Sequence, residues 1–109
     1  MSDIEPVLPF HWSGQRQNDP AHDRVVAFLM MDIQRSPDSV RELANQVNAA
    51  ISGSQPRWER LGNAFHLVIS HEGAVIEDCV DEDAPNYSVP LKEFQQAVSA
   101  WMDYVNSEL

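Results

Sequence analysis

The histidines, the single cysteine and the acidic side chains are the groups of this chain that could do chemistry. The four histidines are His11, His22, His66 and His71. They neither pair at the helical spacing of a metal site nor lie beside a cysteine. Cys79 is flanked by Glu77, Asp78 and Asp81, whose negative charge opposes formation of a nucleophilic thiolate. We therefore expect no catalytic residue, and we do not expect the chain to be an enzyme.

The acidic run from Asp81 to Asp83 offers oxygen ligands, but not in the order that a calcium-binding loop needs. In a loop that begins at Asp81, the sixth place requires glycine and is occupied by Asn86, and the twelfth requires glutamate and is occupied by Lys92. The few glycines are scattered, so they form no phosphate-binding loop. The sequence predicts neither a metal nor another cofactor.

Charge is distributed unevenly along the chain. The segment from Leu61 to Leu91 contains no lysine or arginine, and its acidic residues are Glu72, Glu77, Asp78, Asp81, Glu82 and Asp83. Past Arg60 there are nine acids and one base, whereas the first sixty residues hold eight acids and six bases. Such a negative field repels nucleic acid and anionic lipid and attracts positively charged protein surfaces. The sequence therefore favours a cationic protein partner and excludes nucleic acid and membranes as partners.

Length and composition predict a single domain. The chain has 109 residues, of which 43% are hydrophobic, and a formal net charge of -10. The single cysteine forbids an internal disulfide, the N-terminus lacks the pattern of a signal peptide, and the longest apolar run, Val25 to Met31, is too short to span a bilayer. We expect a soluble cytoplasmic protein with one domain over residues 1–109, in which residues 1–23 are the least ordered part.

Two helices are predicted from capping residues and apolar spacing. Ser36 is suited to cap a helix that begins at Pro37, and Gly53 is suited to end it, which predicts a helix over residues 37–52. A second helix is predicted over residues 90–107. Its apolar stripe consists of Leu91, Phe94, Val98, Trp101 and Val105. This stripe needs a facing surface, for which a sheet is the simplest candidate.

The remaining apolar segments are interpreted as strands. A short edge strand is expected around Val7 to Trp12, where Trp12 would be a surface residue. The run of residues 25–33 could be a buried strand or a short helix, and its length and flanking breakers favour a strand. Segments 57–61, 64–70 and 74–80, separated by turns, predict an antiparallel meander, followed by an acidic loop over residues 81–86. The predicted fold is α+β in the order ββαβββα, a mostly antiparallel sheet of four to five strands with two helices packed on one face.

Residues 53–67, GSQPRWERLGNAFHL, resemble the YacL-like family of small acidic bacterial proteins, in which a Trp-x-Arg-x-Gly segment leads from a helix into a strand. The resemblance extends over roughly residues 37–107, while the first 24 residues match no part of the family and the acidic insert is shorter here. It implies an α+β fold and no established enzymatic activity. It also implies structural roles for Trp58 across the sheet, Arg60 beside a carboxylate and Gly62 in a turn.

Two hypotheses about function remain open. The first is an immunity protein, or antitoxin, that neutralises a cationic toxin such as a secreted nuclease by covering its basic surface. Its partner-binding residues would be Glu72, Glu77, Asp78, Asp81, Glu82, Asp83, Tyr87 and Trp58. The second is a non-catalytic housekeeping adaptor or regulator of the YacL-like kind that binds a cellular protein, and a homodimer is compatible with it.

Overall fold

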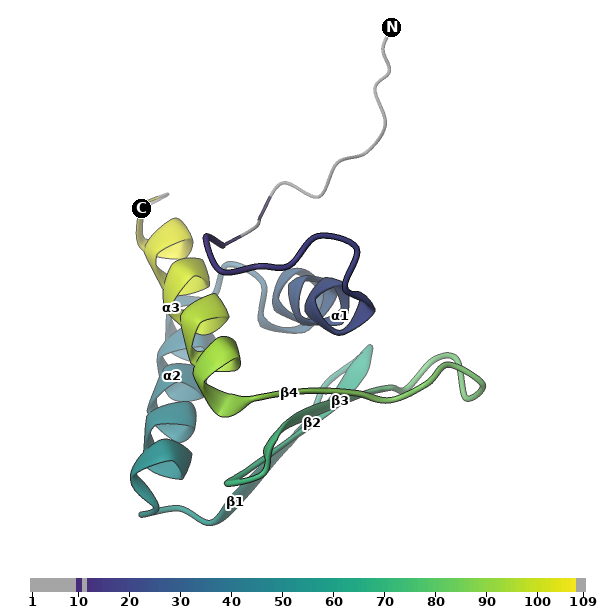
Figure 1. The fold of residues 1–109 in the computed structure, drawn as a ribbon. Helices are drawn as coiled ribbons and strands as arrows, with labels where there is room; N and C mark the ends of the chain where they lie inside the picture. Colours follow the sequence, from purple (N-terminus) through teal and green to yellow (C-terminus); the bar gives the residue numbers. More distant parts are fainter. Residues whose placement is uncertain (1–9, 11, 108–109) are drawn as a thin grey trace, which may run out of the picture.

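The computed structural model describes residue 10 and residues 12–107 of the chain. The elements, labelled in Figure 1, are α1 (Pro20–Phe28), the π-helix η1 (Leu29–Ile33), α2 (Pro37–Ser52), β1 (Arg57–Leu61), β2 (Phe65–Ser70), β3 (Gly73–Asp78), β4 (Tyr87–Val89) and α3 (Leu91–Ser107). Among the described residues, no helix is both long and apolar enough to cross a lipid bilayer. The α+β class predicted from the sequence is confirmed.

The four strands form one antiparallel sheet in the order β1-β2-β3-β4. Directly paired residues lie on the same face, so the register separates the side chains into two sets. Phe65, Leu67 and Ile69 of β2 are buried on one face, and their partners Ile76 and Ala74 of β3 are buried with them. The other face, which we call the open face, carries only half-buried or exposed residues in β2 and β3 apart from Gly73.

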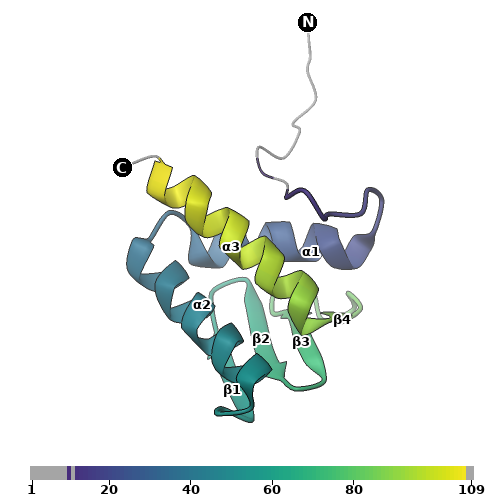
Figure 2. The same ribbon diagram turned by 60° about the vertical axis from the view of Figure 1, so that its left-hand side comes forward.

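The helices cover the buried face of the sheet and share one hydrophobic core with it. The helices α2 and α3 lie side by side and antiparallel at one end of the sheet, and α1 runs across the other part (Figures 1 and 2). The predicted stripe of α3 is fully buried, as Phe94 at 0% and Trp101 at 3% exposure show. Its main neighbour is α2 and not the sheet, which corrects our expectation for the surface that it faces.

The predicted strand over residues 25–33 is wrong, because this segment is helical. The signal that we missed is at its start: the Asp19 carboxylate accepts hydrogen bonds from the backbone N–H groups of Ala21 and His22, and Pro20 occupies the first turn. The buried residues His22, Val25, Val26, Leu29 and Ile33 recur at helical spacing. The fold therefore has a third helical segment where the sequence predicted a strand.

The predicted N-terminal edge strand is not found among the described residues, and Val7 and Leu8 lie outside them. Phe10 and Trp12 have no strand conformation, and Trp12 is only 4% exposed, so the prediction of a surface tryptophan is wrong. The Phe10 ring packs edge-on to Trp101 at 4.9 Å between centroids. Trp12 packs against His22 near the start of α1, so both aromatic side chains instead extend the hydrophobic core.

The remaining element predictions are confirmed with small shifts of their ends. The helix α2 begins after the Ser36 cap and ends at Gly53, whose φ of 84° is the left-handed conformation expected there. The hairpin turn at residues 62–64 and the turn at residues 71–72 separate β1, β2 and β3 as predicted. The short strand β4 was not predicted, so the sheet has four strands with an order of elements that differs from ββαβββα.

Candidate functional site

The strongest concentration of acidic side chains begins at the end of β3 and continues into the loop that follows it. Five acids lie within seven residues, Glu77, Asp78, Asp81, Glu82 and Asp83, and we call residues 77–83 the acidic segment. The loop that contains its second half projects from the end of the sheet that is remote from α2 and α3 (Figure 1). Asp81, Glu82 and Asp83 are all exposed. Among the described residues, no lysine or arginine forms a salt bridge with any of the five.

Hydrogen bonds inside the acidic segment give this loop a defined shape. The Asp78 carboxylate accepts from the backbone N–H groups of Val80 and Asp81, both at 2.8 Å. The Asp81 carboxylate in turn accepts from the N–H of Asp83 at 3.0 Å. The bonds from Asp81 and Val80 lower the pKa of Asp78, and the positive charge of Arg24 adds to that effect. Asp78 is therefore ionised at neutral pH, and its carboxylate holds the turn at Val80 and Asp81 through these two hydrogen bonds.

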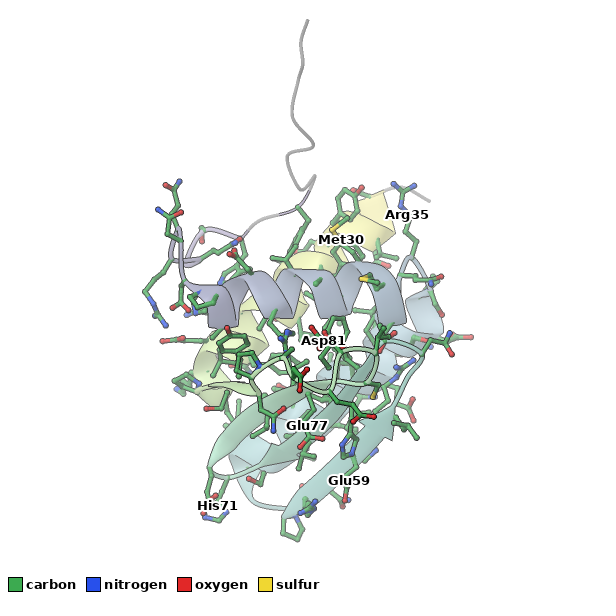
Figure 3. The ribbon with its side chains drawn as sticks, turned by 90° about the vertical axis from the view of Figure 1, so that its right-hand side faces the viewer. Met30, Arg35, Glu59, His71, Glu77 and Asp81 are labelled. Atoms are coloured by element: carbon green, nitrogen blue, oxygen red, sulfur yellow. The ribbon has the colours of Figure 1, made fainter. Side chains whose placement is uncertain are left out.

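The structure does not bring all the predicted partner-binding residues together. Glu72 lies in the turn between β2 and β3, at the opposite end of the hairpin from the acidic segment. Figure 3 illustrates this separation, with His71 of the same turn far from Glu77 and Asp81. Trp58 pairs with Ile69, so its half-buried side chain lies on the helix-covered face. Glu72 and Trp58 are thus separate from the acidic segment.

Tyr87 follows the acidic loop directly, but its ring is covered by Arg24. The residue pairs with Ile76 and therefore lies on the helix-covered side of the sheet. The Arg24 guanidinium lies 4.7 Å from the centroid of the Tyr87 ring and 5.6 Å from that of Phe65, and it donates to the Ile76 carbonyl at 3.0 Å. Tyr87 thus stabilises the contact between α1 and the sheet.

A second charged group lies on the open face of the sheet, and sequence analysis missed it. His66 of β2 contacts carboxylates on both neighbouring strands: its Nδ1 is 2.9 Å from Glu77 Oε1, and its Nε2 is 2.9 Å from Glu59 Oε1. Hydrogen bonds to Glu77 and then to Glu59 raise the pKa of His66, against the opposing effect of partial burial. Figure 3 shows Glu59 and Glu77 on the same side of the molecule as Asp81.

The signal for this group was present in the turns. Counting strand positions away from the turn at residues 71–72 pairs His66 with Glu77, as the register confirms. Counting from the turn at residues 62–64 pairs His66 with Leu61, which places Glu59 one diagonal step away on the same face. The open face thus joins Glu59 to the acidic segment through His66.

A buried histidine organises the N-terminal part of the fold. The His22 ring is fully buried, its Nδ1 accepts the backbone N–H of Arg16 at 2.9 Å, and its Nε2 is 2.9 Å from Glu93 Oε1. Since Nδ1 accepts, the ring proton must be on Nε2, which donates to Glu93. The Arg16 guanidinium binds both Glu93 oxygens, at 3.0 and 3.1 Å, and also contacts Asp19. All polar ring atoms of His22 are satisfied within the fold, which indicates a structural role.

The described residues contain no group of three or more histidine, cysteine or acidic side chains placed to hold a metal ion. Cys79 is exposed, and its backbone N–H donates to the carbonyl of Ala64. His71 is exposed in its turn, and His11 lies outside the described residues. What the arrangement offers is a negatively charged loop, Asp81 to Asp83, beside Glu77 and Glu59 of the open face, whose carboxylates contact His66.

Comparison of the chain with protein-family models, with curated proteins and with solved structures finds no match. The resemblance to the YacL-like family therefore stays a prediction from the sequence.

Proposed function

We propose that this chain is a small acidic binding protein that docks on a cationic protein, most concretely an immunity protein that covers the basic surface of a toxin such as a secreted nuclease. The observation that carries the proposal is the exposed second half of the acidic segment, where the carboxylates of Asp81, Glu82 and Asp83 form no salt bridge with any lysine or arginine of the described residues. Unpaired carboxylates attract a positive surface over a distance of about 10 Å at moderate salt.

The open face supports the proposal because it continues the charged surface with apolar area. Val68 and Val75 pair across β2 and β3 on this face and are half-buried, and Leu61 at the end of β1 is 77% exposed. An interface commonly combines such an apolar centre with charges around it. The acidic segment would direct the approach of the partner, and these side chains would provide apolar contact.

A nuclease is the class of partner that suits this surface best. An enzyme that cleaves RNA or DNA needs a basic cleft for the phosphates, and a projecting loop of carboxylates can occupy such a cleft as a phosphate surrogate. We propose a cytoplasmic location, where an immunity protein would protect the cell that makes the toxin. The second candidate is a non-catalytic adaptor or regulator of the YacL-like kind, which would use the same surface on a different cellular protein, and a homodimer is compatible with it.

Two variants with matched charge test the surface. The first replaces the loop acids (Asp81→Asn, Glu82→Gln, Asp83→Asn), and the control replaces three exposed acids elsewhere (Asp38→Asn, Glu42→Gln, Asp103→Asn). The immobilised wild-type chain is used to capture proteins from the lysate and medium of the producing cell, and association rates are then measured with the purified partner at several salt concentrations.

We expect the loop variant to associate about tenfold or more slowly than the control, with a weaker dependence on salt. Captured nuclease activity that is abolished by the chain supports the immunity function. A captured protein without such activity supports the adaptor instead. Equal association rates for the loop variant and the control would reject the acidic segment as the docking surface.

A further inference from the structure

The contacts of His66 determine its protonation state. A neutral imidazole carries one N–H, so it can donate to one carboxylate only, and its other nitrogen presents a lone pair. Here both ring nitrogens lie 2.9 Å from a carboxylate oxygen, on Glu77 and on Glu59. A lone pair facing an anionic oxygen at that distance is repulsive. Both contacts are favourable together only when the ring is an imidazolium.

The charged groups around His66 form a small cluster whose net charge is zero only when His66 is an imidazolium. On β1, the Arg57 guanidinium pairs with Glu59 Oε2 at 2.9 Å, while Glu59 Oε1 faces His66. On β3, Glu77 Oε1 faces His66, and its Oε2 accepts a hydrogen bond from Asn86 at 3.4 Å. With the imidazolium, Arg57, Glu59, His66 and Glu77 sum to zero charge. Without the proton, the same four groups carry one net negative charge.

We propose that His66 is a proton switch for the open face of the sheet: as imidazolium it links Glu59 and Glu77 across three strands, and when it loses its proton it releases one carboxylate to a cationic partner. The role in docking depends on the function proposed above, whereas the switch itself is a property of the free protein. The partner chemistry that fits is a guanidinium or ammonium group, which replaces the charge that the ring has lost.

The pH direction follows from the geometry. The pKa of His66 is raised by its two carboxylate neighbours, with Glu77 as the larger cause. Because the pKa is raised in the folded state, both carboxylate contacts of His66 are complete below its pKa in the unfolded chain, about 6.5. The second contact is lost as the pH rises through the pKa of His66 in the folded protein. On deprotonation the proton leaves to water, and the ring keeps one N–H for one carboxylate. A cation that binds the released carboxylate must, by linkage, lower the pKa of His66.

The first experiment is an NMR titration of the free protein that follows the ring signals of His66 and its two ring nitrogens. We expect a pKa above that of an unperturbed histidine, with both ring nitrogens protonated at low pH. The variant Glu77→Gln should lower this pKa most and Glu59→Gln less, whereas Glu72→Gln, at the other end of β3, should leave it unchanged. A His66 pKa at or below that of an unperturbed histidine, about 6.5, or one that Glu77→Gln does not move, overturns the switch.

The second experiment tests the link to docking with hexa-arginine peptide as the probe, at one pH unit below and one above the measured His66 pKa. We expect about fivefold tighter binding at the higher pH for the wild-type chain, since one released charge at contact distance contributes about this factor in water. The variant His66→Gln should show no such change. Binding that rises equally in both proteins overturns the link. Failure of the peptide to bind at either pH counts against the proposed docking function, while the titration still decides the switch.

Discussion

The carboxylate of Asp32 stabilises a hairpin that is remote from it in the sequence. Asp32 belongs to the π-helix η1, and its two oxygens accept the backbone N–H groups of Ala64 at 3.0 Å and Phe65 at 2.9 Å. Arg60 donates to the Asp32 carbonyl at 3.3 Å. The wider turn of a π-helix displaces its side chains relative to a regular α-helix. One residue thereby connects the end of the first helical segment to the start of β2.

Removal of this carboxylate should destabilise the protein strongly. Asp32→Ala leaves two N–H groups of buried residues without an acceptor, which should lower the free energy of unfolding by about 2–4 kcal/mol. Asp32→Asn keeps one acceptor oxygen and should cost roughly half as much. Urea unfolding at pH 7 measures both. The control Asp38→Ala, at a side chain 91% exposed, should cost about 0.5 kcal/mol or less. Equal losses in Asp32→Ala and Asp38→Ala would contradict this role.

Single residues were predictable from the sequence where their role depends on near neighbours. Ser36 and Gly53 cap α2 as expected, because capping is decided within one turn of the chain. Arg60, expected beside a carboxylate, lies instead at the backbone carbonyl of Asp32. Asp32 and Arg24 could not be recognised, because their partners are about 30 to 60 residues away in the sequence and depend on how α1 packs on the sheet.

At the scale of elements, the His22–Glu93–Arg16 group joins the N-terminal loop, α1 and α3. Glu93 is the shared acceptor: Arg16 and then His22 lower its pKa. A lowered pKa in the folded state adds stability that is present above the unfolded value of about 4.5 and is lost as the pH falls through the folded value. The contact between these elements should therefore weaken in acid.

Two substitutions separate the charge of Glu93 from its hydrogen bond to His22. Glu93→Ala leaves the buried Nε2–H of His22 without an acceptor and should cost about 2 kcal/mol at pH 7. Glu93→Gln keeps an acceptor oxygen and should cost less than half of that. Both variants should also lose less stability than the wild-type chain between pH 5 and about pH 3. Urea unfolding across this range tests the prediction, which fails if all three proteins show the same slope.

Elements were predictable where the local signals agreed. The helix α2 and the hairpin of β1 and β2 have caps, apolar spacing and turn residues that indicate the same structure. The segment of residues 25–33 lacked this agreement, because its β-branched residues favour a strand while the Asp19–Pro20 start favours a helix. Tertiary burial of one helical stripe decided the outcome. The strand β4 has only three residues, too few to show an alternating pattern.

For the whole molecule, the net charge of -10 means that folding brings like charges together. Added salt screens this repulsion, so we expect the free energy of unfolding to rise by about 1 kcal/mol between 20 and 300 mM sodium chloride. Urea midpoints at the two salt concentrations measure the change. The loop variant (Asp81→Asn, Glu82→Gln, Asp83→Asn) should gain less from salt. A midpoint that falls with salt in the wild-type chain would contradict the expected self-repulsion.

The candidate surface could be predicted in part. The sequence shows that residues 77–83 are acidic and continuous, so their proximity needs no knowledge of the fold. The sequence cannot show that Glu72 lies at the opposite end of β3 or that Glu59 and His66 join the same surface, because these placements depend on strand register. A count of charge along the chain thus located the acidic segment and missed the open face beside it.

The single cysteine has a practical consequence. Cys79 is exposed at the end of β3, within the acidic segment, while its backbone N–H is bonded to Ala64. A maleimide fluorophore would therefore attach at one position, next to the acidic loop, with no background from other thiols of the chain. Binding of a molecule at the acidic segment should change the fluorescence of such a dye. Cys79 therefore provides a labelling site for an optical binding assay.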